Sequence, residues 1–585
     1  MKKKSIYNKI FKTVFILCMM IAFAMQYDMN VEAENLELKS FGVDITTENG
    51  ENTYTIKWWR QELATGNEFY IILPHDVKGT AVKVNYESDE NVYIDDMIIE
   101  NGQLLQELTY GYHKISCGES EYGLFVIYGS DIPTVHITTD SGTMENVYHD
   151  IDYKESGYIT ILQNNNLIYE GSLEYIKGRG NYTWTRAKKP FNIKLFEKGD
   201  ILGFGEAKKW CLLANYLDET LLKNKFGYDL ADNIGLQYTP DSMIVDLYIN
   251  DEYIGNYTLS ERIEVNDHRI DITNLDDLNE LANPDIDIKT VQLKEMKNMK
   301  WAELPNVPEI VTGGYLLELD FLERYAGEIS GFVSDYGQPV VIKSPEYAAK
   351  NQVEYIKKYY QEFEDALLSL DGYNKQGNHY SEYIDVESAA KMYVFQEYIK
   401  NMDAGLSSCY FYKDVRGKLV AAPVWDLDSA FGRVTERNGI RMNDSQGLWV
   451  ENSLLYENRT DKYTIFALLC KHNDFKIEVQ RQWNDYFFGN TDVLVTKFEN
   501  LYRQNQESLF TDKFKWNTVR GLSYSDAYDE MEQSIEVTKA FIRERGYYLD
   551  KVFLTQDYAV VQNMDETEGF AIISKIWYNL KQLCN

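Results

Sequence analysis

Three aspartates in the second half of the chain could together bind a metal ion. Asp403, Asp426 and Asp428 all fall in the segment 401–432. Acidic side chains held close together repel one another, and the usual reason to hold them so is a bound cation. The segment therefore has the residue types that metal-assisted chemistry needs, provided that the fold brings them to one point.

A predicted hairpin would bring these acids together. Two apolar and aromatic runs, 408–413 and 418–425, flank a short turn that contains glycine, and this pattern predicts an antiparallel hairpin. If the lysines at the turn ends of the two runs pair with each other, Asp426 falls opposite Gly405, two residues from Asp403. Acids from the two open ends of the hairpin then converge, and we predict a metal site there.

A basic loop earlier in the chain could hold an anion. The segment 177–184 reads KGRGNYTW, and its glycines let the backbone approach a ligand closely around the guanidinium of Arg179. Lys189 and Lys194 follow soon after. In a chain with a net charge of −33, this local cluster favours an anionic ligand such as phosphate. A charged turn between two strands would give the same pattern and is the alternative interpretation.

The overall charge and the N-terminus indicate where the protein works. With 59 basic and 92 acidic residues, the chain lacks the basic surface that nucleic acids or anionic lipids require. Residues 1–33 have a lysine-rich start followed by an uncharged apolar run at 13–25, which predicts a secretory signal, either cleaved or retained as an N-terminal anchor. We expect a secreted or cell-surface protein with no further membrane contact. The scattered cysteines argue against a disulfide framework, although one bridge stays open.

The pattern of elements divides the chain into domains. Short strands at a spacing of about ten residues predict a β-sandwich accessory domain at 34–130. Residues 131–552 are strand-rich at first and helix-rich later, which predicts an α+β domain, and the tail 553–585 has no clear pattern. The length of 585 residues is itself too great for one compact core.

Several elements of the larger domain would position the candidate residues. Asp385 is a predicted N-cap of a helix with an apolar face that leads to Asp403, and Asp218 is a predicted N-cap of a helix that Gly235 ends. The segment 275–310 is polar and contains prolines, so it is predicted to be a loop-like insertion. Other elements are predicted as a hairpin at 243–259, a helix at 347–370, and helices at 465–485, 493–508 and 525–548.

Five motifs in this order resemble the spore coat protein H (CotH) kinase family. They are KGRGNYTW with Lys189-Pro190, KWCLLANYLD at 209–218, YIGNYTLSE at 253–261, Asn401-Met-Asp403, and PVWDLD at 423–428 with Phe431-Gly432. The resemblance covers roughly 132–550. It implies a divergent protein-kinase-like fold with an antiparallel, strand-rich N-lobe and a helical C-lobe. It also implies transfer of phosphate from ATP to serines of partner proteins.

The resemblance implies roles for the acidic segment. Asp403 would orient the substrate hydroxyl as a general base, and Asp426 would bind the metal, with Asp428 as a second ligand or a support. Protein kinases place an asparagine ligand five residues after the catalytic aspartate, and this position is Ser408 here. Either Ser408 and a water molecule replace that ligand, or one metal site is weak. The implied cofactors are ATP and Mg²⁺ (or Mn²⁺).

The resemblance also implies roles in the strand-rich part. Arg179 and Asn181 would lie where the phosphates pass, and Lys189 or Lys194 would reach them. Glu261 would end a hairpin beside the adenine, where its neighbouring backbone matters more than its side chain. The implied partners are a nucleotide and a protein substrate with serine (or threonine) residues.

Two other functions are compatible with parts of the sequence. Asp426-Leu-Asp428 is a DxD motif, by which many glycosyltransferases hold a metal and a nucleotide sugar. That reading requires a doubly wound sheet before the motif, whereas the sequence predicts antiparallel strands. Ser408 favours a second alternative, a non-catalytic surface or coat scaffold that keeps a kinase-like fold without activity.

Overall fold

The computed structural model describes residues 37–47, 50, 52–60, 67–437, 440–453, 463–516, 524–555 and 558. The predicted signal at 1–33 and most of the predicted tail at 553–585 lie outside these residues. No helix within the described ranges is long and apolar enough to cross a membrane. The chain divides into two compact units, one up to residue 128 with 251–253, and one with the remaining residues.

The first unit is built from two sheets. One sheet has the order β3-β9-β8-β5-β6, and the strands β2-β1-β4-β7 form a second set. Trp58 stacks on Phe69 with ring centroids 3.8 Å apart, next to the buried Tyr122. The strands are β1 (Ser40–Thr46), β2 (Thr53–Lys57), β3 (Glu68–Leu73), β4 (Val82–Glu87), β5 (Val92–Ile94), β6 (Met97–Ile99), β7 (Leu104–Leu105), β8 (Gly111–Cys117) and β9 (Ser120–Tyr128).

The second unit begins with a closed barrel of seven strands. The strand order is β14-β13-β12-β11-β10-β15-β16, and β14 also pairs with β16, which closes the ring. Alternate residues such as Ile193 and Leu195 are buried in a core that the strands share. The strands are β10 (Thr134–Thr139), β11 (Glu155–Gln163), β12 (Asn166–Gly178), β13 (Phe191–Asp200), β14 (Glu206–Leu213), β15 (Ser242–Ile249) and β16 (Glu252–Glu261). The predicted hairpin at 243–259 is confirmed as β15 and β16.

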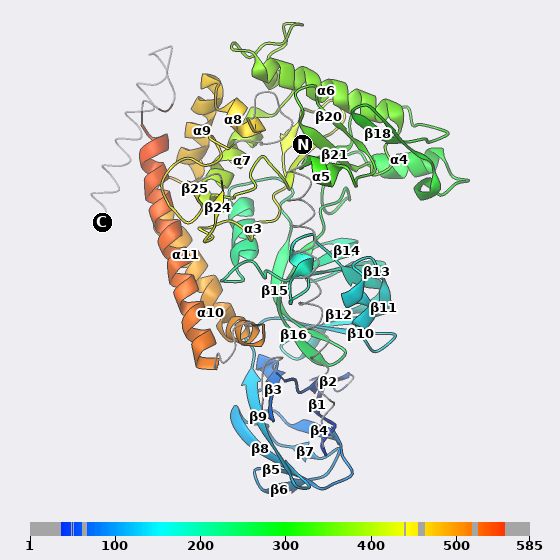
Figure 1. Ribbon diagram of the computed structural model, residues 1–585, viewed down its shortest axis with the longest axis vertical. Coiled ribbons are helices and arrows are strands. Elements are labelled where there is room, and N and C mark those ends of the chain that lie inside the picture. Colours follow the sequence, from blue (N-terminus) through cyan, green and yellow to red (C-terminus); the bar gives the residue numbers. More distant parts are fainter. Residues whose placement is uncertain are drawn as a thin grey trace, which may run out of the picture. The chain divides into compact units, whose positions relative to one another are not determined.

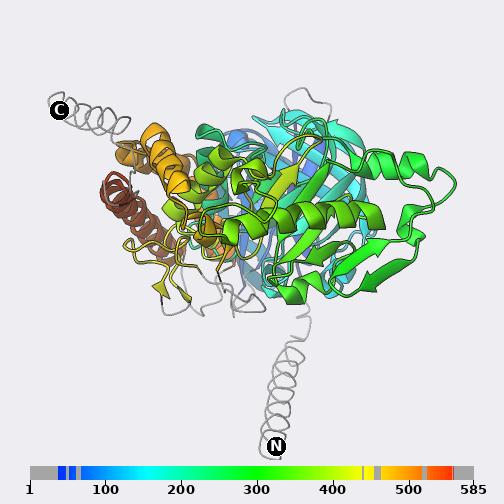
Figure 2. The same ribbon diagram turned by 90° about the horizontal axis from the view of Figure 1, so that it is seen from above.

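A second sheet of this unit carries the predicted central hairpin. Its order is β17-β18-β20-β21-β19-β22-β23. In Figures 1 and 2, helix α6 (Lys350–Leu368) runs across this sheet, and it contacts β18 and β20. The strands are β17 (Leu293–Met296), β18 (Met299–Ala302), β19 (Tyr315–Leu319), β20 (Gly331–Val333), β21 (Pro339–Ser344), β22 (Cys409–Lys413) and β23 (Val420–Ala421).

The prediction that 275–310 is a loop-like insertion is wrong for much of its length. The segment contains helix α4 (Leu275–Ala282) and the strands β17 and β18. The Asn274 side chain accepts a hydrogen bond from the Asp277 N–H and caps α4, whose Leu275 is buried. The helix and strands are too short to show a periodic pattern, which is why the polar composition dominated the prediction.

The remaining helices form the other part of the second unit (Figure 1). Helix α7 is buried along most of its length, and α10 and α11 lie side by side. The single helix predicted at 465–485 is two helices, because the chain turns at 470–472. The helices are α3 (Lys223–Asn233), α5 (Leu322–Tyr325), α7 (Val386–Ile399), α8 (Ile465–Leu469), α9 (Asn473–Tyr486), α10 (Thr491–Lys515) and α11 (Tyr524–Phe553). The mixed α+β class predicted from the sequence is confirmed.

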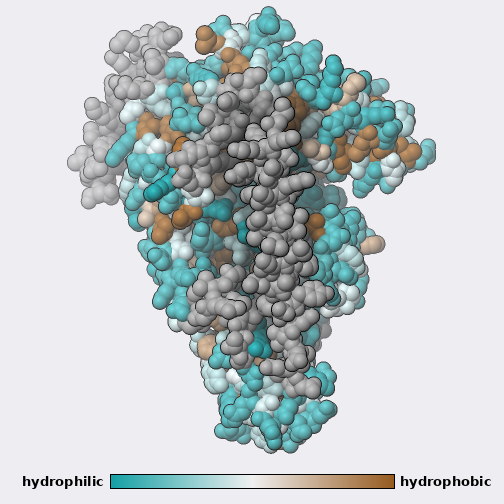
Figure 3. Space-filling model, viewed as in Figure 1, coloured by the Kyte–Doolittle hydropathy of each residue, from teal (hydrophilic) through white to brown (hydrophobic). Residues whose placement is uncertain are grey.

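The described surface on the visible face is mainly hydrophilic (Figure 3). In Figure 3 apolar side chains also gather at the upper right, near the position of α4 in Figure 1. Leu281 of α4 and Leu293 and Met296 of β17 are exposed. The cysteines in the described residues, Cys117, Cys211, Cys409 and Cys470, are all free, as expected for a chain without a disulfide framework.

Candidate active site

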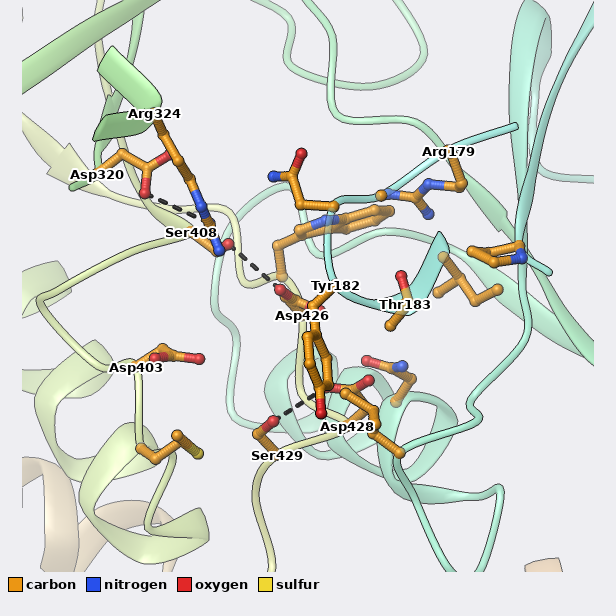
Figure 4. Close-up of a pocket in the computed structure, with 18 of the residues that line it drawn as sticks. Arg179, Tyr182, Thr183, Asp320, Arg324, Asp403, Ser408, Asp426, Asp428 and Ser429 are labelled. Carbon is orange, nitrogen blue, oxygen red and sulfur yellow. Dashed lines mark hydrogen bonds and ion pairs between the residues drawn. The ribbon is translucent and has the colours of Figure 1, made fainter. Parts of the chain in front are cut away.

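A cavity of about 700 Å³ in the second unit collects most of the predicted site residues. Its walls come from the loop after β12, from α3, from the segment around β19 and α5, and from the open ends of the hairpin. Figure 4 shows side chains from these elements pointing into one space. Of the residues predicted from the sequence, the lining includes Arg179, Asn181, Asp403, Ser408, Asp426 and Asp428.

The hairpin forms with a register one residue away from the prediction. Tyr412 pairs with Val420 and Phe411 with Ala421, so Lys413 falls opposite Leu419 rather than Lys418. The turn is longer than predicted because Arg416 takes a left-handed conformation with φ of 60°. The acids still converge because Asp426 lies beyond the paired residues.

The segment around Asp426 is fixed by contacts with α3. Asp426 has a φ of 60°, a conformation that costs energy in a residue other than glycine. The next N–H, of Leu427, donates to Asn224 Oδ1 at 2.8 Å. The Leu427 side chain packs on Gly227, where an added Cβ would lie 2.4 Å from Leu427 Cδ1. Helix α3 therefore holds Asp426 in a conformation that turns its carboxylate into the cavity.

The two aspartates of the hairpin end have raised pKa values. Asp426 is open to the cavity and accepts a hydrogen bond from Ser408 Oγ at 3.4 Å. The surrounding protein limits its hydration and raises its pKa, and the charge of Asp403 raises it further. Asp428 is buried, and burial followed by the charge of Asp426 raises its pKa to about 8. The cavity thus holds acidic side chains whose charge the protein compensates poorly.

Helix α7 delivers Asp403 to the cavity. Asp385 accepts a hydrogen bond from the Ser388 N–H at 2.7 Å, which confirms the predicted N-cap. The helix ends where Lys400 adopts a left-handed conformation with φ of 49°. The Asp403 N–H then donates to Asn401 Oδ1 at 3.1 Å, which shapes the loop after the helix. The other predicted cap, Asp218, instead accepts from the Lys223 N–H in the first turn of α3.

On the opposite wall, Arg179 is held against an aromatic pair. Its Cζ lies 5.2 Å from the centroid of the Trp425 ring, and Trp425 stacks on Tyr228 at 6.0 Å. The Nη1 atom of Arg179 is buried and has no hydrogen-bond partner among the described residues. Because Arg179 also lines the cavity, this donor could be satisfied by a polar ligand there. Tyr182 and Thr183 line the cavity as well (Figure 4).

Three predicted site residues do not line this cavity. Lys194 lies on the outer side of β13, because Ile193 and Leu195 point inward, and its Nζ is 2.5 Å from Glu174. Lys189 donates to the Trp184 carbonyl at 2.7 Å. Glu261 lies in the strand pair that closes the barrel, 3.5 Å from Arg269. Burial raises the pKa of Glu261 to about 7.

Other residues of the cavity were not predicted from the sequence. Asn224 and Tyr228 are four residues apart on α3 and therefore share a face, which is a signal that the predicted helix contained. Glu318 lies in β19, and Asp320 follows this strand directly. Arg324 comes from the four-residue helix α5, which has no detectable periodicity.

The donor set fits a divalent cation of the magnesium type. Within the described ranges, no three acidic, histidine or cysteine side chains lie close enough together to hold a metal ion by themselves. Mg²⁺ is commonly bound by one or two carboxylates together with phosphate oxygens and water, rather than by a complete protein cage. Asp426 and Asp428 supply two carboxylates of this kind, and a bound cation would offset the charge of the neighbouring carboxylate that contributes to the raised pKa of each.

The fold and the cavity define an α+β protein with an acidic site of about 700 Å³. Residues 176–549, from β12 to α11, match the family of CotH kinase proteins. The match covers more than half of the chain, so the protein belongs to the CotH kinase family. No curated protein matches it. The resemblance recognised from the five motifs is therefore confirmed at the level of the family.

Proposed function

We propose that the protein is a secreted or cell-surface phosphotransferase that moves the γ-phosphate of ATP to serine or threonine hydroxyls of a partner protein. The observation that carries this proposal is a single cavity that combines three aspartates with an arginine-bearing loop. The volume of about 700 Å³ suits a nucleotide, since ligand pockets usually have 300–1,000 Å³. Membership of the CotH kinase family supports the same reaction.

The arrangement of elements supports a kinase-like division into two lobes. In this reading the barrel is the strand-rich N-lobe, and the helices from α6 onward are the C-lobe. The phosphate-binding loop then follows β12, and the catalytic loop follows α7. Phosphoryl transfer depends mainly on positioning and on neutralising charge, so a barrel loop facing an acidic segment contains the parts that the reaction needs.

The proposed step uses the residues of the cavity directly. The acceptor hydroxyl oxygen forms a bond with the γ-phosphorus while the bond between that phosphorus and the β–γ bridging oxygen breaks, releasing ADP. Asp403 accepts the proton of the hydroxyl, and Arg179 offsets negative charge on the phosphates. Mg²⁺ (or Mn²⁺) held by Asp426 and Asp428 would neutralise phosphate oxygens when bound.

The test is transfer of labelled γ-phosphate by the purified protein in the presence of Mg²⁺ or Mn²⁺, to itself and to serine-containing acceptors. Replacing Asp403 with Asn should lower the rate by about 10²–10⁴-fold, the usual contribution of a general base. The melting temperature should stay the same, since Asp403 lies in a loop at the cavity. If wild-type protein neither binds ATP with metal nor labels any acceptor, the proposal is wrong.

Two other functions would give different results in the same experiments. Ser408, which replaces an asparagine ligand of kinases, favours a non-catalytic scaffold, and this reading predicts partner binding without transfer. The DxD motif favours a glycosyltransferase, which predicts metal-dependent binding of UDP-sugars instead of ATP. The sheet before the motif has antiparallel pairs throughout its described residues, and this argues against the glycosyltransferase. Calorimetry with ATP and UDP-sugars, with and without Mg²⁺, separates the three.

A further inference from the structure

Four of the described residues that line the cavity have cationic side chains. Lys343 Nζ lies 3.6 Å from Glu318 and 3.3 Å from Glu328, so its charge is offset by two carboxylates. Arg433 lies next to Asp428 and donates to Ser429 Oγ at 2.7 Å. The other two are Arg179 and Arg324.

Arg324 reaches the cavity from α5 with donors to spare. Its Nη1 atom donates to Ser407 Oγ at 2.7 Å and lies 3.4 Å from Asp320 Oδ1. These are its hydrogen bonds among the described residues, so Nε and Nη2 stay available for a ligand. The side chain keeps 40% of its surface exposed, whereas its partner Asp320 is buried. Asp320 and Ser407 therefore orient the guanidinium and leave its Nε and Nη2 donors available.

The two arginines flank Asp426 from different walls. In Figure 4 Arg324 points toward Ser408 and Asp426 from one side, and Arg179 lies on the other side, beyond Asp426. Both guanidinium charges act on the Asp426 carboxylate. Asp403 appears on the same side of Asp426 as Arg324, below it. A phosphate chain crossing Asp426 would thus meet Arg179 near the barrel and Arg324 near Asp403.

We infer that Arg324 and Arg179 form a two-arginine clamp on the polyphosphate, in which Arg324 binds the terminal phosphate and Arg179 binds the phosphates nearer the nucleoside. This inference rests on the proposed function. It assigns to arginines the role that the sequence gave to Lys189 and Lys194, which the structure places outside the cavity. A guanidinium can donate two parallel hydrogen bonds to one phosphate, which suits it to fix the group that is transferred.

The test is nucleotide binding by the full protein, measured by calorimetry with Mg²⁺ and either ADP or a non-hydrolysable ATP analogue. R324Q should weaken binding of the ATP analogue about 10- to 100-fold, the loss expected for charged hydrogen bonds, and leave ADP binding nearly unchanged. R179Q should weaken binding of both nucleotides. R324K, which keeps the charge but not the paired donors, should fall between wild type and R324Q.

A control separates ligand binding from a structural role. Ser407→Ala removes the hydrogen bond that orients Arg324 but keeps the guanidinium, so it should reduce the preference for the ATP analogue over ADP less than R324Q does. The inference is overturned if R324Q weakens both nucleotides equally or neither, or if Ser407→Ala removes the preference while R324Q keeps it. If wild-type protein binds neither nucleotide, the proposed function itself fails and the clamp fails with it.

Discussion

Two buried carboxyl groups in the second unit have opposite surroundings. Glu397 of α7 is fully buried, lies 2.6 Å from Arg545 Nη2, and accepts from the N–H groups of Trp449 and Val450 at 2.6 and 2.7 Å. Asp428 is also buried, but among the described residues its hydrogen bond comes from Ser429 Oγ at 3.3 Å. Glu397 has its partners within the fold, whereas Asp428 lacks comparable ones. Under the proposed function, this difference would separate an acid that stabilises the fold from one that serves a ligand.

The largest expected effect is a loss of folding stability, and we expect it for substitution of Glu397 but not for substitution of Asp428. Glu397→Gln leaves Arg545 buried without its counter-charge, which should reduce the free energy of unfolding by about 3–5 kcal/mol. Above pH 8, where Asp428 is ionised, Asp428→Asn removes a poorly compensated charge, so without metal it should be neutral or stabilising there. Urea unfolding of both variants beside the wild type checks the comparison. Equal losses at the two positions would show that Asp428 is also a structural acid.

The next effect concerns metal-dependent binding of nucleotide. Wild-type protein should bind ATP more tightly with Mg²⁺ than with EDTA, because the cation joins phosphate oxygens to Asp426 and Asp428. Asp426→Asn should bring the ratio of the two affinities close to one. Asp229→Asn, at a half-buried position of α3 paired with Lys225, is the matched control and should keep the wild-type ratio. A normal ratio in Asp426→Asn would remove Asp426 from the metal site.

Stability without metal should depend on pH through Asp428. Its pKa is about 8 in the folded protein and about 4 in an unfolded chain, so the folded state binds the extra proton between these values. Its stabilising contribution is complete below pH 4 and is lost as the pH rises through 8, at up to about 1.4 kcal/mol per unit. Glu261 and Glu318, with pKa values raised to about 7 by burial, act in the same direction.

The measurement is therefore the difference between wild type and Asp428→Asn in urea unfolding from pH 5 to pH 9. The variant should lose less stability than the wild type as the pH rises. Saturating Mg²⁺ should reduce the pH dependence of the wild type, because the cation replaces the proton. Identical slopes for the two proteins would mean that Asp428 does not titrate in this range.

The smallest expected effect is a gain at Ser408. This residue has a φ of 50°, a conformation that asparagine adopts more readily than most residues. Ser408→Asn should therefore fold normally and supply an amide oxygen beside Asp426, raising the affinity for Mg²⁺ a few-fold. Titration of nucleotide binding with Mg²⁺ measures the change. A decrease would indicate that Ser408 is itself adapted to this site.

Local chemistry made much of this arrangement predictable. The helix before Asp403 could be predicted from the sequence because Asp385 is a good N-cap and the apolar residues of the helix are regularly spaced. The hairpin was readable from two aromatic runs around a glycine, but its register was not, because the length of the turn depends on the left-handed conformation of Arg416. Lys194 was assigned to the phosphates although Ile193 and Leu195 already indicated that it points outward.

Long-range pairing was beyond the sequence pattern. Closure of the barrel joins Trp210 to Glu261, which are far apart in the chain, and no local signal selects that partner. Arg324 could not be predicted for the same reason. Helix α5 is too short for a periodic pattern, and Ser407, which accepts a hydrogen bond from Arg324, comes from another element. Residues that matter through distant neighbours have to be found from coordinates.

The closed barrel has a mechanical consequence. A sheet with free edges can shear or lose a strand when a ligand enters, but a ring of strands hydrogen-bonded all round resists both. The loop from Arg179 to Thr183 lines the cavity and lies between β12 and β13, so both of its ends are anchored in this ring. The barrel thus acts as a stiff support that fixes the position of Arg179 at the cavity.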